Sequence, residues 1–321
     1  GQLGYVYDFL AQQQVLHHLF GAIPQINWGY PPFALLPLLP LGGMPYFAAL
    51  LVWTVCGLGL YFGSATVTAR RGQFSFLAAA PAVAITLVTG QNGFFTAALM
   101  IGTLYLVDRR PVAAGLILGL LCCKPQMGLL FPVALALSGR WRCFVAAAAT
   151  VAALAAASWG ISGPALWADY FREGLPFQYG VMTQGSGLLM PMVPTAFMHA
   201  RALGASTSVA WAVQAPFSLL AAAAVIWTFA RRRDPLLSQA VLVTAGFIFT
   251  PYVAVYDMVV LGWLVARLQD RLTTAWDTRL MLAVWSLPAL AIVFGLCRLP
   301  LAAPLLAAFL LRLLWHLRTA R

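Results

Sequence analysis

The sequence predicts an all-α, polytopic membrane protein, and three observations point to this fold class. Hydrophobic residues make up 62% of the chain and charged residues only 8%, whereas about a quarter of the residues in a soluble domain are charged. The hydrophobic residues are gathered into long runs separated by short polar breaks. When these runs are drawn as membrane spans, most of the arginines fall on one side of the bilayer. Helices are the expected spanning elements, because each satisfies its own backbone hydrogen bonds in lipid.

Apolar runs define about ten or eleven helical segments in a membrane domain that covers residues 32–321. The runs are 45–67, 74–89, 94–107, 111–123, 128–138, 143–162, 207–230, 235–250, 256–268, 280–297 and 299–315. Several are shorter than the roughly 20 residues of a straight span, so polar joints such as Gln91-Asn92 would lie below the membrane surface. Backbone at that depth has to be covered by protein or line a wet cavity. The sequence therefore predicts short, broken helices around an outward cavity.

Arginine asymmetry predicts the orientation, because short cytoplasmic loops are enriched in Lys and Arg. The majority side carries Arg70, Arg71, Arg109, Arg110, Arg140, Arg142, Arg231, Arg232, Arg233, Arg267, Arg271, Arg279, Arg312, Arg318 and Arg321. The opposite side carries only Lys124, Arg172, Arg201 and Arg298. The majority side is therefore predicted to be cytoplasmic.

This orientation leaves two outward segments, residues 1–31 and residues 163–206. Residues 5–20 mix apolar and polar positions in the way of an amphipathic helix lying on the membrane surface. Residues 163–206 form the longest predicted loop, and long loops commonly carry function. An outward N-terminus without a preceding span is difficult to translocate, so we expect a helix upstream of Gly1 in the complete protein.

Composition also excludes some classes of protein. The net charge of +11 does not indicate a nucleic-acid partner, because the arginines sit at span ends and form no basic stripe with interleaved aromatics. The cysteines have no spacing typical of a disulfide framework or a zinc site; they are Cys56, Cys122, Cys123, Cys143 and Cys297. We expect neither nucleic-acid binding nor a metal centre.

Lys124 is the strongest candidate for a functional charge. It lies between two short apolar runs, and a charge at the centre of a membrane costs at least about 2.5–3.5 kcal/mol on insertion scales. Its side chain either extends to the outer interface as an anchor or binds an anion, most naturally a lipid phosphate. Pro125 would break the helix there, and Gln126 would add hydrogen-bond donors. We favour the phosphate hypothesis.

Two further polar signatures are predicted on the same side. Gln91 and Asn92 form either a plain polar turn or a set of amide donors and acceptors suited to sugar hydroxyls or a phosphate. Tyr30, followed by Pro31-Pro32, is either an interfacial aromatic anchor with a helix-start proline or part of the same site.

Acidic residues are the candidates for a general base. Asp257, beside Tyr256 and near Tyr252, would lie in the membrane as a base, a proton carrier or a partner of Lys124. The alternatives are a structural salt bridge and a charge at the N-terminus of a helix. Surface positions are predicted for the remaining outward ionisable residues, which include Asp8, Asp169, Glu173, His17, His18 and His199.

In order and spacing, these signatures resemble glycosyltransferase family 87, bacterial membrane glycosyltransferases that use polyprenyl-phosphate sugars. The matching pieces, over roughly residues 1–270, are Trp28-Gly29-Tyr30-Pro31-Pro32, Gly90-Gln91-Asn92-Gly93, Asp108-Arg109-Arg110-Pro111, Lys124-Pro125-Gln126, Thr250-Pro251-Tyr252 and Tyr256-Asp257. Each motif alone is weak, whereas the ordered set is fairly specific.

The resemblance implies the GT-C architecture, in the inner (plasma) membrane, with an active site facing the periplasm or exterior. It implies inverting transfer of a mannose-like hexose or pentose from a polyprenyl-phosphate donor to a glycolipid or glycan acceptor, and names no cofactor besides that donor. The residues expected to bind the donor are Lys124, Gln126, Gln91, Asn92, Tyr30, Tyr252 and Tyr256.

The resemblance also bears on the catalytic base. It places this acid in the first outward loop, in a stretch expected to lie upstream of Gly1. Asp8 matches a later Tyr-Asp position of that loop, so Asp257 and Asp8 are the weaker candidates within the chain.

Two other classes of protein stay open. A transporter also places polar joints in broken helices, though near the midplane and commonly within inverted repeats; the joints here gather at one face. A non-catalytic protein that binds lipid-linked sugars would need no base. An assay that measures both glycosyl transfer and binding of a lipid-linked sugar separates an enzyme from these two classes.

Overall fold

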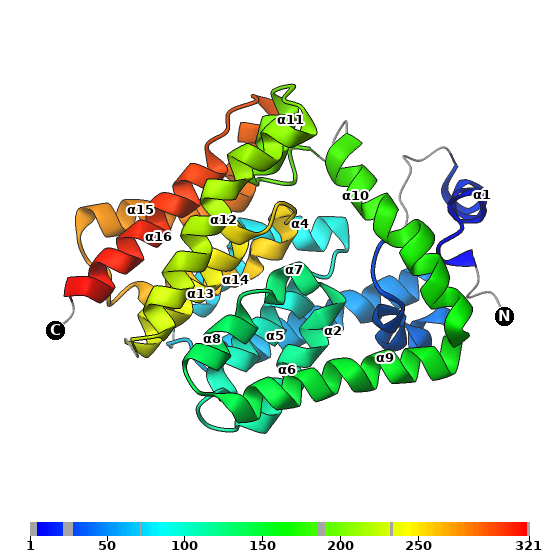
Figure 1. The fold of residues 1–321 in the computed structure, drawn as a ribbon, viewed down its shortest axis with the longest axis horizontal. Helices are drawn as coiled ribbons and strands as arrows, with labels where there is room; N and C mark the ends of the chain where they lie inside the picture. Colours follow the sequence, from blue (N-terminus) through cyan, green and yellow to red (C-terminus); the bar gives the residue numbers. More distant parts are fainter. Residues whose placement is uncertain (1–4, 22–27, 71, 185–189, 232–233, 320–321) are drawn as a thin grey trace.

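The computed structural model describes residues 5–21, 28–70, 72–184, 190–231 and 234–319, which form a helical bundle without a β-strand (Figure 1). The predicted all-α, polytopic fold class is therefore confirmed. Within the described ranges, four helical stretches are long and apolar enough to cross a membrane. They are α2 (Tyr46–Thr66), the run from α9 into α10 (Trp141–Gln184), α12 (Thr207–Phe229) and α15 (Ala275–Leu296).

The remaining apolar runs form shorter helices, as their length predicts. They are α3 (Phe74–Ala78), α4 (Pro81–Thr89), α5 (Gly93–Leu106), α6 (Pro111–Leu120), α7 (Pro125–Gly128), α8 (Phe131–Leu137), α13 (Pro235–Phe249), α14 (Val259–Leu268) and α16 (Ala302–Thr319).

Prolines and glycines set the breaks between these helices. Pro81, Pro111, Pro125 and Pro235 each occupy the first position of a helix, where their missing N–H leaves no hydrogen bond unmade. α4 ends at Gly90, whose φ of 63° is left-handed and favours glycine. The broken spans are thus encoded locally.

Near the N-terminus, proline also fixes the conformation of a 3₁₀ segment, η2 (Pro32–Gly43). Pro37 and Pro40 lie inside it, and neither can donate the backbone hydrogen bond that an α-helix requires. Before it, α1 (Phe9–Phe20) begins at Asp8, whose carboxylate accepts from the Ala11 N–H at 3.0 Å.

α13 and α14 form the centre of one half of the bundle, and almost every side chain of α14 is buried. α12 and α16 pack on α13, and α15 packs on α16 and α14. In the other half, α9 runs along the lower edge of Figure 1, against α6.

Glycines allow α6 and α9 to approach closely. A Cβ on Gly115 would lie 2.4 Å from the Cys143 carbonyl oxygen, and a Cβ on Gly119 would lie 2.3 Å from the Cβ of Thr150. Small residues four positions apart are typical of tightly packed membrane helices.

The predicted outward loop 163–206 is largely helical in its described part, which differs from our expectation. α9 (Trp141–Asp169) is kinked at Gly163, with φ of 76°, and continues through the π-helical η4 (Tyr170–Gly174) into α10 (Leu175–Gln184). A further helix, α11 (Ala196–Ala202), precedes α12. The glycine and the following Pro164 redirect the chain without ending its helical structure.

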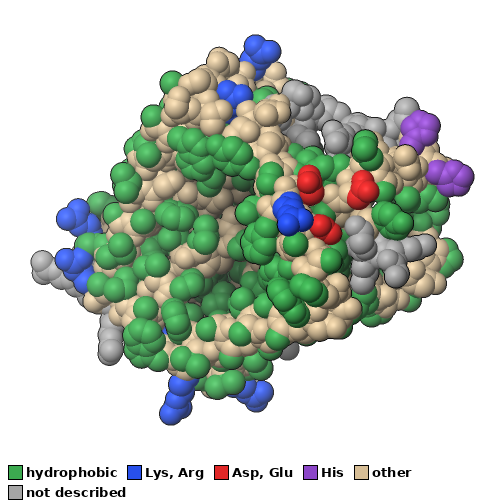
Figure 2. Space-filling model, turned by 45° about the vertical axis from the view of Figure 1, so that its right-hand side comes forward, with side chains coloured by type: hydrophobic (Ala, Val, Ile, Leu, Met, Phe, Trp, Pro, Cys, Tyr) green, Lys and Arg blue, Asp and Glu red, His purple; other side chains and the backbone are tan. Residues whose placement is uncertain are grey.

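The surface fits a membrane environment. Large apolar side chains such as Phe47, Leu51 and Val55 on α2 are exposed. In Figure 2, hydrophobic side chains spread over the middle of the face, and many of the visible basic side chains project from its left and lower edges. Lipid is the expected solvent for such an apolar surface.

The arginine-rich loops lie together at one end of the bundle. Arg70 pairs with Asp270, and the Arg267 guanidinium donates to the Thr68 carbonyl at 2.6 Å. Arg271 pairs with Asp234. Arg140 binds Asp108 at 2.8 Å, and both line one cavity with Pro235. Four arginines of the predicted cytoplasmic set, Arg71, Arg232, Arg233 and Arg321, lie outside the described residues.

Because the arginine-rich loops lie at one end of the bundle, the two ends should differ in their access to a membrane-impermeant thiol reagent. The experiment uses protein whose native cysteines are replaced. Arg142→Cys and Arg279→Cys, both at exposed positions, should react from one side of the bilayer, and Glu173→Cys from the other. Labelling of Glu173→Cys together with either arginine position would contradict the orientation, since arginine asymmetry is its basis.

Candidate functional site

Three polar joints that are distant in the sequence meet at Lys124. This residue lies between the short 3₁₀ turn η3 (Leu121–Cys123) and α7, and its side chain is buried, with 3% of the residue exposed. Its ammonium group forms an ion pair with Asp257, which is 2% exposed. It also donates to the side-chain oxygen of Asn92 at 2.8 Å. Lys124 and Asn92, both predicted for the site, therefore lie in direct contact.

Two tyrosine rings complete this group. The Lys124 nitrogen lies 4.6 Å from the centroid of the Tyr256 ring and 6.0 Å from that of Tyr30, within the range of cation–π attraction. The Asn92 amide nitrogen donates to the Tyr30 hydroxyl at 3.3 Å. We call Tyr30, Asn92, Lys124, Tyr256 and Asp257 the Lys124 cluster.

Asp257 is held on both of its oxygens. One pairs with Lys124, and the other accepts from the Ala254 backbone N–H at 3.2 Å. Asp257 lies in the 3₁₀ turn η6 (Val255–Met258), so its position follows from that turn. A buried carboxylate is strongly destabilising unless it is paired and hydrogen-bonded. This geometry suits a counter-ion of Lys124, one of the roles that the sequence left open.

A close backbone contact brings α5 and η6 together. A Cβ on Gly93 would lie 2.0 Å from the Tyr256 carbonyl oxygen, a distance that no side chain can tolerate. The same carbonyl accepts from the Thr86 hydroxyl at 3.2 Å. Gly93 is therefore needed for the approach that places Asn92 and Asp257 on either side of Lys124.

The segment before α1 and the chain before α11 contact the cluster from the other side. The Tyr7 hydroxyl donates to the Tyr30 carbonyl at 2.6 Å. The Thr195 hydroxyl donates to the Pro251 carbonyl at 2.7 Å, and the Val255 N–H donates to the Met192 carbonyl at 2.9 Å. The chain before α11 thus fixes the segment that leads into Asp257.

The other predicted donor-site residues lie around the cluster without joining its hydrogen bonds. Gln91 and Gln126 are half-buried, and among the described residues neither shares a hydrogen bond with the cluster. Tyr252 is half-buried, and its carbonyl accepts from the Thr250 hydroxyl at 3.1 Å. Asp8 is exposed and serves as the N-cap of α1.

His199 is not a surface residue, which corrects our expectation. It is 5% exposed, and its Nδ1 lies 3.0 Å from the Thr195 carbonyl. Burial lowers the pKa of its imidazole below the ordinary value. His199 is buried because the whole of α11 packs against the protein: Phe197 and Met198, next to His199, are buried as well. His17 and His18 are exposed, as predicted.

Sequence reasoning missed several residues that support the cluster, namely Tyr7, Thr86, Met192 and Thr195. Thr86 and Thr195 also make ordinary local contacts, to the Ala82 carbonyl at 2.7 Å and to the Met198 N–H at 3.2 Å. Such contacts explain a threonine without any tertiary role. Met192 acts through its carbonyl, which no sequence pattern reveals.

The model of glycosyltransferase family 87 matches residues 28–251, which is more than half of the chain and includes Tyr30, Asn92 and Lys124. The chain belongs to glycosyltransferase family 87. No curated protein and no solved structure matches it significantly. Together with the apolar helices, this membership makes the protein a membrane glycosyltransferase. Asp257, the counter-ion of Lys124, lies just beyond the matched residues.

The close approach at Gly93 predicts a difference between two substitutions in α5. Gly93→Ala should destabilise the protein by about 1–3 kcal/mol, the usual cost of overpacking, because its methyl group would meet the Tyr256 carbonyl. Gly102→Ala should be neutral or stabilising, since its nearest neighbours would lie 3.6 Å away and alanine favours helix by about 0.5–1 kcal/mol.

The measurement is the midpoint of thermal unfolding of each purified variant in lipid nanodiscs. Equal midpoints for Gly93→Ala and Gly102→Ala would contradict the close contact between α5 and η6.

Proposed function

We propose that this family 87 glycosyltransferase moves a mannose-like hexose or pentose from a polyprenyl-phosphate donor to a glycolipid or glycan acceptor, and that the Lys124 cluster binds the donor. The observation that carries the proposal is a buried lysine, fixed by an aspartate and an asparagine, within a membrane domain. Intramembrane charges are costly and are usually functional.

Lys124 suits the donor phosphate because it keeps a hydrogen-bond donor available. An ammonium group has three donors, and two are used by Asp257 and Asn92. The third can bind a phosphate oxygen with a charge-assisted hydrogen bond. As the sugar leaves the phosphate, negative charge on that oxygen grows, and a cation fixed beforehand stabilises it without rearrangement.

The tyrosines and amides around Lys124 suit the sugar. Tyr30 and Tyr256 offer aromatic faces, and the Asn92 amide can bond to hydroxyls as donor and acceptor. Gln91, Gln126 and Tyr252 lie beside the cluster and would contact the sugar or phosphate without a change of fold. This arrangement supports a sugar phosphate over an apolar ligand.

For Asp257 we propose the role of counter-ion in place of general base. A base must be free to accept the proton of the attacking hydroxyl, whereas both Asp257 oxygens already accept hydrogen bonds. Asp8 is engaged as the N-cap of α1. In this proposal the carboxylate of Asp257 orients Lys124 and reduces the cost of burying it.

The proposed site faces the exterior, and the membrane is the bacterial inner membrane. The support is that the cluster and the arginine-rich loops lie at opposite ends of α5, a helix of 14 residues, or about 20 Å. The positive-inside rule assigns the arginine-rich end to the cytoplasm, which leaves the cluster near the outer face.

Donor binding tests the role of Lys124. Lys124→Ala should weaken binding of a polyprenyl-phosphate sugar about tenfold or more, because a charge-assisted hydrogen bond is lost. Lys124→Arg should restore part of the affinity, since the charge remains but the geometry changes. Arg172→Ala removes an exposed outward cation and should bind like wild type.

The binding constants are measured by titration of the donor into protein in nanodiscs. If Lys124→Ala bound as tightly as Arg172→Ala, the phosphate would not be held by Lys124. In proteoliposomes, movement of labelled donor across the bilayer without glycosyl transfer would instead favour a transporter, and binding without either process a non-catalytic protein.

A further inference from the structure

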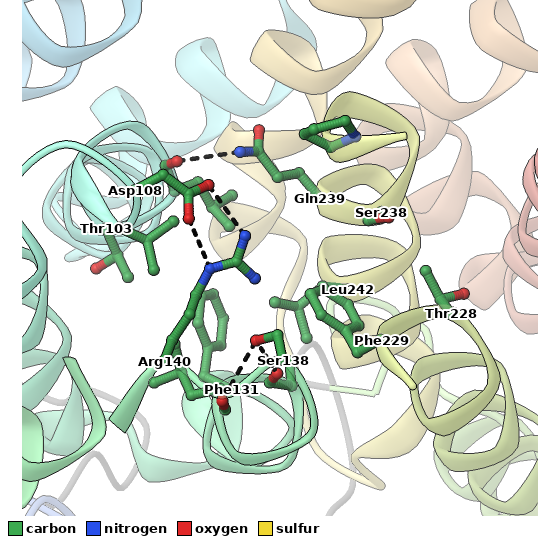
Figure 3. A pocket seen from close by; sticks show the side chains of 15 residues that line it. Thr103, Asp108, Phe131, Ser138, Arg140, Thr228, Phe229, Ser238, Gln239 and Leu242 are labelled. Carbon is green, nitrogen blue, oxygen red and sulfur yellow. Dashed lines mark hydrogen bonds and ion pairs between the residues drawn. The ribbon is translucent and has the colours of Figure 1, made fainter. Parts of the chain in front are cut away.

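A second polar feature lies at the arginine-rich end, away from the Lys124 cluster. It is a cavity of about 410 Å³ lined by residues of α5, α8, α12 and α13 and by the Asp108–Arg140 ion pair (Figure 3). Its volume falls within the roughly 300–1,000 Å³ typical of ligand pockets. The predicted donor site includes none of its lining residues.

The walls of this cavity are partly apolar: its lining also includes the polar residues Thr103, Ser138, Thr228, Ser238 and Gln239. Phe131 and Leu135 of α8 face it together with Phe229 of α12 and Leu242 of α13. These side chains lie between helices of a membrane domain. The apolar part of the wall can accommodate a hydrocarbon chain, and the polar residues and the ion pair suit a head group, so the cavity matches an amphipathic ligand.

The rim, in contrast, carries a cation with unused donors. The Arg140 guanidinium binds Asp108 through two nitrogens, at 2.8 and 3.0 Å. Arginine has five N–H donors, so this pair leaves several unused. In Figure 3 the third guanidinium nitrogen carries no dashed line and points into the cavity.

The surroundings of the rim are positively charged. Arg109 and Arg110 follow Asp108 in the chain, and Arg231 lies two positions after Phe229. In addition, α9 begins immediately after Arg140, and helix N-termini favour anions; the N-terminus of α13 is already capped by the Asp234 carboxylate. Asp108 pairs with Arg140 and Asp234 pairs with Arg271, so the other arginines leave this end with a net positive charge.

We propose that this cavity binds an anionic phospholipid from the adjacent leaflet. One acyl chain would occupy the apolar interior, and the phosphate would accept hydrogen bonds from the free donors of Arg140. Basic pockets between membrane helices are known to suit anionic head groups. The site is independent of the donor site and of the glycosyl-transfer reaction.

Phosphatidylglycerol is the probe for this proposal, offered to the full chain in phosphatidylcholine nanodiscs, and retained lipid is quantified by native mass spectrometry. Arg140→Gln should weaken retention about tenfold or more, as expected for loss of a charge-assisted hydrogen bond. Arg142→Gln, a matched loss of an exposed arginine, should change it little. Asp108→Asn should strengthen it, because Arg140 is released.

The opposite effects of Asp108→Asn and Arg140→Gln distinguish a lipid site from a structural ion pair, since both substitutions break the pair. Ala134→Phe should also reduce retention, because it fills the cavity and leaves the charge unchanged. A photoreactive group on one acyl chain gives a test free of any core substitution: its crosslinks should map to α8 and α13.

Three results would overturn the proposal. Equal losses in Arg140→Gln and Arg142→Gln would indicate diffuse attraction by surface charge. Crosslinks spread over the outer surface, away from α8 and α13, would place the acyl chain elsewhere. If inorganic phosphate at moderate concentration displaced phosphatidylglycerol, the acyl chain would not contribute to binding. The site would then be a phosphate site at the rim.

Discussion

The buried ion pair between Lys124 and Asp257 is the interaction on which the arrangement of this site depends. Neither charge is tolerable alone in the interior of the protein, because unpaired burial costs several kcal/mol per ion. The two residues are separated by 133 positions and lie in breaks of different helices. Their pairing therefore fixes the joint between α6 and α7 against the turn before α14, and Asn92 joins them from the start of α5.

Other parts of the fold help to hold Lys124 and Asp257 together. Gly93 allows the α5 backbone to approach η6, and the chain before α11 holds the segment that leads into Asp257. The Lys124 ammonium group is consequently preorganised, because its side chain is held in place before any substrate binds. Preorganised charge is effective in catalysis because it needs no rearrangement when charge develops on a leaving group. In the function that we propose, the recipient is the donor phosphate.

The sequence predicted the helical class and the positions of most breaks, because Pro81, Pro111 and Pro125 act locally and because apolar runs have a characteristic length in membranes. It also predicted that Lys124 and Asn92 belong to one site, and the two side chains are in contact. It left the partner of Asp257 open, since an ion pair over such a sequence separation depends on packing. The burial of His199 and the helical structure within residues 163–206 were missed for the same reason: local polarity suggests exposure, and tertiary contacts override it.

A double-mutant cycle on Lys124 and Asp257 tests the central claim most directly. The free energy of unfolding is measured in bicelles for Lys124→Met, Asp257→Asn and the double variant. Each single substitution leaves one buried charge unpaired and should cost about 3–5 kcal/mol. The double variant has no unpaired charge and should be more stable than the sum of the two losses predicts, by at least about 2 kcal/mol. Additive losses would contradict the account, because they would show that the two side chains do not interact in the folded protein.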